Sequence, residues 1–216
     1  MSDTTARALP ASLEATLSSS GALGRRKRTL DITVALLLLL FLMPMLLAIA
    51  IIVRLDGGGP ALFRQRRGGL RGEPFVIYKF RTMRVFEDDG AVRQASKNDV
   101  RCTAVGRVLR RLSLDELPQL VNVLKGEMSL VGPRPHALAH DAQFQRPLPL
   151  YSHRFLVRPG ITGLAQVSGW RGELCAPEDV VHRLEKDIEY VRTWSFWKDI
   201  KILCATLKCP MDPRAY

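Results

Sequence analysis

A run of 22 residues without a charged side chain, residues 32–53, limits what this chain can fold into more than any other feature. As a straight helix it would be roughly 33 Å long at about 1.5 Å per residue, which matches the hydrocarbon core of a bilayer. It is too long and lies too far from the start of the chain for a removable signal peptide. No polar stripe runs along it, so a helix buried in a soluble core is disfavoured. The sequence therefore predicts a membrane helix.

Pro44 and the charges on either side of this run argue against a straight crossing. Pro44 removes a helix hydrogen bond near the centre and favours a bend. Basic residues flank both ends, and the positive-inside rule keeps each basic flank in the cytoplasm. A re-entrant helix that bends and returns to the same face satisfies both observations; a signal anchor with its second flank outside is the alternative. The flanking residues are Arg25, Arg26, Lys27 and Arg28 before the run, and Arg54, Arg64, Arg66, Arg67 and Arg71 after it.

The charge balance points to an anionic partner. Lys and Arg number 32 against 21 Asp and Glu, which gives a net charge of +11. Such an excess suits nucleic acid, an anionic membrane surface or phosphorylated substrates. No base-reading motif or aromatic RNA-binding pattern occurs, so nucleic acid is not expected. The simplest interpretation of Arg64, Arg66 and Arg67 is that they contact lipid headgroups. The more specific alternative is that they bind the phosphate of an acceptor.

Composition disfavours several other classes of protein. Because 47% of the residues are apolar, the chain can build a core, and wholesale disorder is excluded. The cysteines show no CxxC spacing, which disfavours a zinc knuckle, a thioredoxin-type site and a disulfide framework. Reduced thiols therefore suit the four cysteines, Cys102, Cys175, Cys204 and Cys209.

The rest of the chain predicts an α+β fold built from short elements. Residues 1–24 are predicted to form a mobile tail, 25–56 the re-entrant helix, and 57–216 one compact domain. The expected elements of that domain are glycine-rich turns within 57–74, a strand at 75–80, helices at 107–112 and 178–192, a helix in 114–130 that ends near Gly126, a helix at 137–155 with a break at Pro147 and Pro149, and a loop at 159–163. An amphipathic helix from Trp194 to Leu207 suits the membrane interface, with packing on the core of the domain as the alternative.

The densest group of candidate functional residues is SLDELPQL, from Ser113 to Leu120. A structural interpretation exists: Ser113 and Glu116 form a capping box, and Asp115 complements the helix dipole. The functional alternative is a site for Mg²⁺ and a diphosphate, because Mg²⁺ takes one or two carboxylates plus phosphate oxygens. A carboxylate can also attack phosphorus and form an acyl phosphate. The arginines that would pair with phosphate are Arg110, Arg111 and Arg134.

Several stretches in the same order resemble the bacterial monotopic phosphoglycosyl transferases, also called the bacterial sugar transferase family. They are KRTLD (27–31), YKFRTM (78–83), RRLSLDELPQLVNVLKGEMSLVGPRP (110–135) and VRPGITGLAQVSG (157–169). The resemblance covers nearly all of the chain except the tail. It implies an α+β fold with a mostly helical, small catalytic domain at 57–216, a re-entrant membrane helix and amphipathic interface helices.

The resemblance also implies an activity. The family transfers a sugar phosphate from a UDP-sugar to a polyprenyl phosphate, normally undecaprenyl phosphate, and releases UMP. By resemblance, Asp115 is the nucleophile and Glu116 a ligand of Mg²⁺, on the cytoplasmic face of the bacterial inner membrane. The other site positions implied are Lys79, Arg81, Arg110 and Arg134, which would neutralise phosphate charge, and Asp199, a further acidic position. An aspartyl-phosphosugar intermediate predicts ping-pong kinetics.

The sugar is predicted from two further stretches, GPRPHALAH (132–140) and QVSGWRGE (166–173). They are most similar to the branch that makes undecaprenyl-diphosphate-glucose for exopolysaccharide, so UDP-glucose is favoured and UDP-galactose comes second. Gln166, Trp170 and Arg171 are candidate contacts to the sugar or uridine, with loop packing as the alternative.

Two departures from the family pattern stand out. Met43 precedes Pro44 where the family often has Ser, and the missing hydroxyl removes one way to satisfy the carbonyls freed by proline. The multi-span and nucleotide-fold region of many relatives is not expected here. The competing function is a non-catalytic, membrane-tethered scaffold that binds anions. The oligomeric state is open, with a homodimer as one option.

Overall fold

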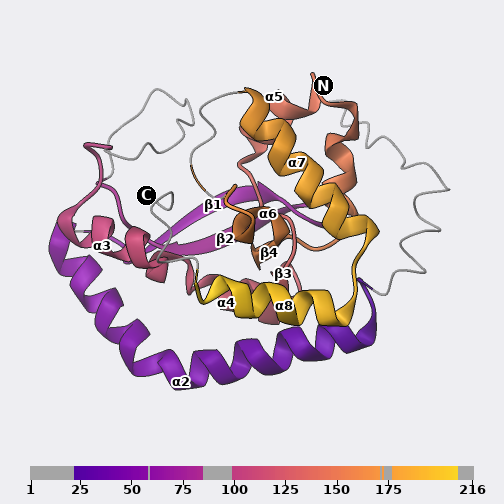
Figure 1. Ribbon diagram of the computed structural model, residues 1–216. Coiled ribbons are helices and arrows are strands. Elements are labelled where there is room, and N and C mark those ends of the chain that lie inside the picture. The colour runs from indigo at the N-terminus through magenta and orange to yellow at the C-terminus, as the bar shows by residue number, and fades with distance from the viewer. Residues whose placement is uncertain (1–21, 58, 85–98, 171, 173–176, 209–216) are drawn as a thin grey trace.

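The structure, a computed structural model, describes residues 22–57, 59–84, 99–170, 172 and 177–208. Within these ranges, helices of very different lengths surround two small two-stranded sheets, so the predicted α+β class is confirmed. The longest helix runs along the edge of the body that the other elements form (Figure 1). Most of the predicted tail lies outside the described residues.

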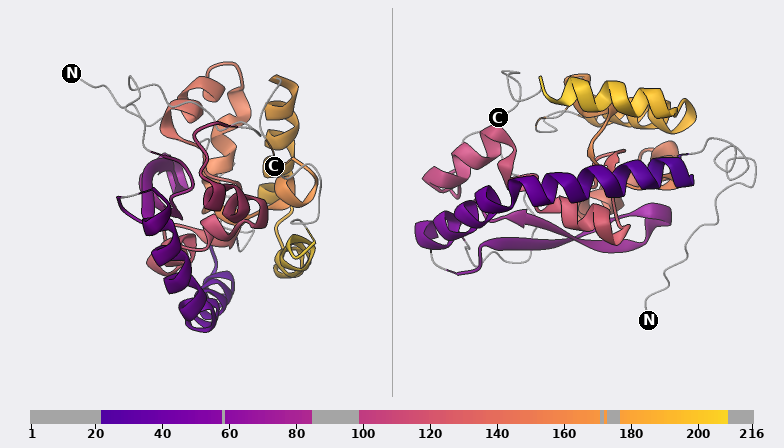
Figure 2. Two further views of the ribbon diagram at one scale, coloured as in Figure 1. Left: turned by 90° about the vertical axis from the view of Figure 1, so that its left-hand side faces the viewer. Right: turned by 90° about the horizontal axis from the view of Figure 1, so that it is seen from below.

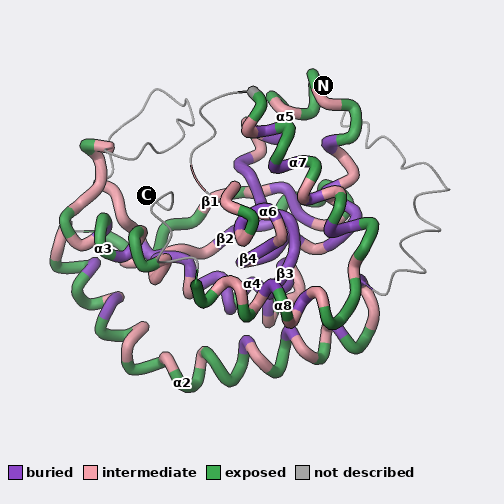
Figure 3. Tube along the Cα trace, in the orientation of Figure 1, coloured by how far each residue is buried: buried purple, intermediate pink, exposed green. Residues whose placement is uncertain are grey.

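Helix α2 (Arg25–Gly57) contains the uncharged run and continues through Pro44 as one helix, with a bend that is visible in its ribbon (Figure 1). Among the described helices, it alone is long and apolar enough to cross a membrane, and only 11% of its most apolar stretch is buried. Figure 3 shows how much of its surface is exposed. Leu40 and Phe41 are among its exposed side chains. Such a continuous apolar surface suits lipid rather than water.

Both ends of α2 contact the same folded body. Near its start, Lys27 Nζ donates a hydrogen bond to the carbonyl of Val131 at 3.0 Å. Near its end, the carbonyl of Val53 accepts a hydrogen bond from Arg81 Nη2, also at 3.0 Å. A straight crossing would separate the two ends by the hydrocarbon core, about 30 Å thick, and one soluble body would not reach both. The contacts therefore favour the re-entrant arrangement, with the body on one side of the helix (Figure 2).

An antiparallel hairpin follows α2. Strand β1 (Leu62–Gly68) pairs with β2 (Pro74–Phe80), and the short turn η1 (Leu70–Gly72) joins them. The strand predicted at 75–80 is confirmed. Of the glycine-rich turns predicted within 57–74, the one at Gly69–Gly72 is confirmed, whereas the basic residues between the turns form β1, which was not predicted.

The composition of β1 hid it from sequence analysis. Its central residues are Arg and Gln, which lack the β-branched and aromatic character that identifies strands. In the structure its side chains alternate between two faces, as a strand requires. Arg64 and Arg66 are exposed, whereas Arg67 points to the other face and is half-buried. The three arginines that were expected to act alike are therefore separated by the pleat.

The second sheet joins two distant parts of the chain. Strand β3 (Ser129–Val131) pairs in parallel with β4 (Gly160–Thr162). The loop predicted at 159–163 is therefore wrong, since three of its residues form β4. A Cβ atom on Gly160 would collide with the backbone nitrogen of Gly132. Glycine allows the two backbones to approach this closely.

Helices complete the body. The helix predicted at 114–130 is confirmed over α4 (Gln119–Lys125), which ends near Gly126 as expected, whereas η2 (Leu114–Glu116) and β3 occupy other parts of that range. Gly126 ends α4 with a left-handed backbone, φ 86°. The other helical elements are α3 (Ala104–Leu112), α5 (Leu138–Gln145), η3 (Pro149–Leu156), α6 (Leu164–Val167), α7 (Pro177–Arg192) and α8 (Phe196–Thr206). The helices predicted at 178–192 and from Trp194 to Leu207 correspond to α7 and α8.

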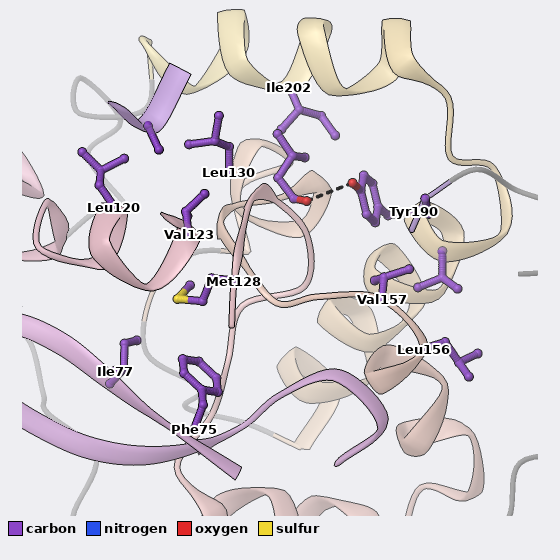
Figure 4. Close-up of a cluster of buried hydrophobic side chains, with 14 residues drawn as sticks. Phe75, Ile77, Leu120, Val123, Met128, Leu130, Leu156, Val157, Tyr190 and Ile202 are labelled. Atoms are coloured by element: carbon purple, nitrogen blue, oxygen red, sulfur yellow. Dashed lines mark hydrogen bonds between the residues drawn. The ribbon is translucent and has the colours of Figure 1, made fainter. Parts of the chain in front are cut away.

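One apolar cluster unites α4 with both sheets and with α2, α7 and α8 (Figure 4). Burying a large aliphatic or aromatic side chain contributes about 1.5–3 kcal/mol, so this cluster is a main source of stability. Because α4 packs into it, the turn that precedes α4 is held in place. The labelled members are Phe75, Ile77, Leu120, Val123, Met128, Leu130, Leu156, Val157, Tyr190 and Ile202.

A buried polar group attaches the start of α2 to α7 and α8. Lys27 Nζ lies 2.6 Å from Asp199 Oδ2. The hydroxyl of Tyr190 donates to Asp199 Oδ1 at 2.8 Å, and the indole Nε1 of Trp194 donates to Asp199 Oδ2 at 3.1 Å. We call Lys27, Tyr190, Trp194 and Asp199 the anchor network.

Candidate active site

The turn between α3 and α4 carries two adjacent carboxylates. Ser113 ends α3 with a left-handed backbone, φ 59°, and its N–H donates to the carbonyl of Arg110 at 3.1 Å. The predicted capping box is therefore wrong: the side chain of Ser113 makes no capping bond to η2, and Ser113 terminates one helix instead of opening the next. The sharp change of direction places Asp115 and Glu116 in η2, where both are buried.

Glu116 lies between two cationic side chains. Lys79 Nζ, from β2, is 2.8 Å from Glu116 Oε1. Arg134 donates through both terminal nitrogens, with Nη2 2.5 Å from Oε1 and Nη1 3.0 Å from Oε2. Although burial opposes ionisation, Arg134 and Lys79 hold the pKa of Glu116 well below its usual range. Glu116 is therefore a fixed negative charge at neutral pH.

Asp115 has a different environment. Among the described residues, its carboxylate takes part in no hydrogen bond. Burial, followed by the adjacent charge of Glu116, raises the pKa of Asp115 to about 6, against the pull of Lys79, Arg110 and Arg134. The group is thus largely ionised at pH 7, yet its oxygens are not engaged by hydrogen-bond donors. A buried carboxylate of this kind is available to a reacting atom or a metal.

The position of Arg134 is set by the GPRP turn, which we define as residues 132–135. The carbonyl of Pro133 accepts from the backbone N–H of Gly160 at 2.9 Å. The next two carbonyls accept from arginine side chains: Arg154 Nη2 lies 2.5 Å from the Arg134 oxygen, and Arg67 Nη1 lies 3.2 Å from the Pro135 oxygen. Because prolines lack N–H groups, these carbonyl bonds hold the turn.

Asn122 holds β2 against α4. Its Oδ1 accepts from the backbone N–H of Tyr78 at 3.1 Å, and its Nδ2 donates to the carbonyl of Val76 at 2.7 Å. The side-chain amide thus pairs with β2 as a neighbouring strand would. Since Lys79 follows Tyr78 directly, this contact sets where Lys79 reaches Glu116. Sequence analysis missed Asn122, whose only signal was a polar residue on the apolar face of α4.

The structure brings together five of the predicted site residues: Lys79, Arg110, Asp115, Glu116 and Arg134 interact with one another, either by direct contact or through their charges. Arg110, in the last turn of α3, acts on Asp115 by charge.

The other predicted site residues have partners outside this group. Arg81 binds the carbonyl of Val53 near the end of α2. Gln166 is buried and donates to the carbonyl of Ile161 at 3.0 Å. Asp199 belongs to the anchor network. Arg171 lies outside the described residues.

The residues present fit a Mg²⁺ ion that is completed by substrate. Among the described residues, no three His, Cys, Asp or Glu side chains gather to hold a metal. Mg²⁺ nevertheless needs only one or two carboxylates when phosphate oxygens and water supply the other ligands. Asp115 has uncommitted oxygens. Glu116 Oε1 accepts from both Lys79 and Arg134, whereas Oε2 accepts from Arg134 Nη1 and keeps one of its two lone pairs.

The amino-acid sequence matches a known protein family and several named proteins. A family model described as bacterial sugar transferase matches residues 23–212. The chain is 51% identical over 197 residues to a UDP-glucose:undecaprenyl-phosphate glucose-1-phosphate transferase of Caulobacter vibrioides, covering 89% of this chain and 74% of that protein.

Proteins with the same name from Escherichia coli K12 and Klebsiella pneumoniae are 52% and 51% identical over 181 residues. Each match covers 84% of this chain but only 39% of the relative. The chain therefore spans about two fifths of the length of these two relatives.

Proposed function

The chain belongs to the bacterial sugar transferase family, and we propose that it transfers glucose 1-phosphate from UDP-glucose to undecaprenyl phosphate with release of UMP. The relatives reported above carry this activity in their names and share about half of their aligned residues with the chain. The observation within this molecule that carries the proposal is Asp115: a buried carboxylate that has no hydrogen-bond donor among the described residues and is surrounded by cationic side chains.

In the first half-reaction, a carboxylate oxygen of Asp115 attacks the phosphorus that bears the sugar. A bond forms between that oxygen and phosphorus while the bond to the bridging oxygen of the diphosphate breaks. UMP leaves with the electron pair, and an aspartyl-phosphosugar remains. In the second half-reaction, an oxygen of the lipid phosphate attacks the same phosphorus, and the carboxylate of Asp115 leaves. The lipid then carries a diphosphate-linked sugar.

The surrounding charges serve both steps. Phosphoryl transfer depends mainly on positioning and on neutralising charge at phosphate oxygens. Lys79, Arg110 and Arg134 supply positive charge within reach of Asp115. Glu116 keeps Lys79 and Arg134 in place through direct ion pairs. The covalent intermediate allows UMP to depart before the lipid phosphate arrives, so two anionic substrates need not occupy the site together.

Mg²⁺ is the proposed cofactor. Glu116 is its proposed protein ligand, with Asp115 adjacent, and the bound ion would offset the charge of the diphosphate. Activity is expected to be lost on chelation with EDTA and restored by added Mg²⁺. Unchanged activity in EDTA would remove Mg²⁺ from the proposal.

The protein associates with a membrane, and we propose the cytoplasmic face of the inner membrane as the location. The exposed apolar surface of α2 supports insertion, and the contacts at both of its ends support re-entry from one face. The acceptor's lipid tail is anchored in the same bilayer, so a catalytic body held at the surface meets the acceptor phosphate there. Exposed Trp197 on α8 suits the interface as well.

The test is UMP release by the protein in nanodiscs with Mg²⁺ and undecaprenyl phosphate. Four donors are compared: UDP-glucose, UDP-galactose, UDP-N-acetylglucosamine and UDP-N-acetylgalactosamine. We expect acceptor-dependent release with UDP-glucose and much slower release with the others. A clear preference for another donor would correct the sugar while keeping the reaction. No release with any of the four, from protein shown to be folded, would count against the transferase and in favour of an anion-binding scaffold.

A further inference from the structure

Arg67 is placed differently from the other arginines of β1. It faces the GPRP turn, while its neighbours Arg64 and Arg66 are exposed on the other side of the strand. Its backbone forms a bridge with Ala137, just after the turn. Its Nη1 donates to the carbonyl of Pro135 at 3.2 Å. These contacts bring the guanidinium next to Arg134, the residue that binds Glu116.

The guanidinium of Arg67 lacks a compensating anion of its own. Among the described residues it forms no ion pair, and its Nε is buried without a hydrogen-bond partner. Burial, followed by the like charge of Arg134, lowers the pKa of Arg67 to about 10, against the attraction of Glu116 and Asp141. Both oxygens of Glu116 are already engaged by Lys79 and Arg134.

An arrangement of this kind costs stability unless something else balances the charge, because buried charges are normally paired. Four cationic side chains, Arg67, Lys79, Arg110 and Arg134, surround the two adjacent carboxylates of the site, Asp115 and Glu116, and Asp141 also attracts Arg67. The surplus positive charge matches a substrate that brings several negative phosphate oxygens. The donor's diphosphate carries its negative charge on two phosphate groups, whereas the phosphate monoester of a lipid carries it on one, so the donor can contact more of these cations at once.

We propose that Arg67 is a further substrate-binding residue, whose guanidinium contacts the phosphate oxygens of the nucleoside-diphosphate donor alongside Arg134. Arginine suits this task because its planar fork pairs with phosphate through two hydrogen bonds. The inference rests on the proposed function, and it assigns to donor binding a residue that its position in a basic stretch had suggested for lipid headgroups.

The test compares Arg67→Met and Arg67→Lys with Arg66→Met, a matched control on the same strand whose side chain is exposed. Methionine keeps much of the buried alkyl volume, and lysine keeps the charge without the fork. The first measurement is the donor half-reaction without acceptor: UMP release and the mass of the phosphosugar adduct against UDP-glucose concentration. The second is the steady-state KM for undecaprenyl phosphate. Thermal unfolding, with and without added UDP, reports folding and binding separately.

We expect Arg67→Met to raise the UDP-glucose concentration for half-maximal adduct formation about 10- to 100-fold, the loss typical of a hydrogen bond to a charged group. Arg67→Lys should recover part of this loss. The KM of Arg67→Met for undecaprenyl phosphate should stay within about twofold, and Arg66→Met should resemble the wild type in the donor half-reaction and in thermal unfolding. UDP should raise the unfolding temperature of the wild type and of Arg66→Met more than that of Arg67→Met.

Other outcomes would overturn the assignment in distinguishable ways. An equal loss in both half-reactions, with a lower unfolding temperature, would mean that Arg67 only supports the GPRP turn, since Asp115 and Arg134 serve both steps. A rise in the KM for undecaprenyl phosphate alone would assign Arg67 to the acceptor. A wild type that releases no UMP with any donor would refute the proposed function itself, whereas an active wild type with an unaffected Arg67→Met variant would refute this inference alone.

Discussion

Two buried groups in this protein pair lysine with a carboxylate, yet their carboxylates are satisfied to very different degrees. In the anchor network, Asp199 is 1% exposed and receives bonds from Lys27, Tyr190 and Trp194. In the turn between α3 and α4, Glu116 is equally well paired, but Asp115 beside it has no hydrogen-bond donor among the described residues. A fully satisfied polar group stabilises one arrangement. An incompletely satisfied one retains the capacity to bind or react.

The largest expected effect on activity comes from Asp115, the carboxylate without a hydrogen-bond donor among the described residues. Asp115→Asn removes the proposed nucleophile while preserving its volume, and we expect UMP release to fall about 10³-fold or more, as loss of a nucleophile commonly causes. The unfolding temperature should change little, because no hydrogen bond to the native carboxylate is lost. The phosphosugar adduct should be absent from intact-mass spectra. Turnover near the wild-type rate would show that Asp115 does not form the intermediate.

For Asp199, whose carboxylate is fully hydrogen-bonded, we expect the opposite result: a loss of stability rather than of activity. Asp199→Asn leaves the buried ammonium of Lys27 without its anion, and breaking a buried pair of this type costs about 3 kcal/mol or more. We expect a clearly lower unfolding temperature in detergent, with an unchanged KM for UDP-glucose in the fraction that stays folded. A large change in that KM without loss of stability would move Asp199 from the anchor network to the substrate site.

Asn122 holds β2, and therefore Lys79, in place, so its substitution should cause an intermediate loss of activity. Asn122→Ala removes both side-chain bonds to β2 and lets Lys79 shift relative to Glu116. We expect kcat/KM for UDP-glucose to fall about tenfold, on the scale of one or two hydrogen bonds. Val121→Ala, an exposed change on the same helix, is the control. Equal kinetics for the two variants would mean that β2 is held without Asn122.

The smallest expected effect is the coupling free energy between Lys27 and Asp199. In a double-mutant cycle, Lys27→Met and Asp199→Asn should together destabilise the protein less than the sum of the single changes, by about 1–2 kcal/mol. The reason is that the double variant removes both members of this ion pair, so neither charge is left without the other. Thermal unfolding of all four proteins in one detergent gives the coupling. Strict additivity would show that the 2.6 Å contact contributes little beyond packing.

Features that depend on local composition were predictable. The uncharged run predicted α2, because no soluble surface accommodates 22 consecutive residues of this kind. The apolar run at 75–80 predicted β2, and helical spacing predicted α7. The adjacent carboxylates of Asp115 and Glu116, with Arg134, were identified as candidates from the residues themselves, and Lys79 was added through the family resemblance. The structure places these four together.

Features that depend on a distant partner were not predictable. Strand β4 exists because Gly160 pairs next to Gly132, and its sequence alone favours a loop. Ser113 matched a capping box, yet the chain reverses there and the residue ends α3. Lys27 and Asp199 are separated by most of the chain, and no local sequence pattern predicts that they pair.

By itself, the sequence determined that this chain enters a membrane and carries a carboxylate pair among basic residues, because hydropathy and motif spacing are properties of consecutive residues. Only the tertiary structure decided which charges are matched. It pairs Asp199 with Lys27 and engages Glu116 with Lys79 and Arg134, whereas Asp115 and Arg67 have no direct partner of opposite charge within the part of the chain that the structure describes. The physical reason is that a charge is satisfied or left open by what the fold brings within hydrogen-bonding distance, and those neighbours come from far along the chain.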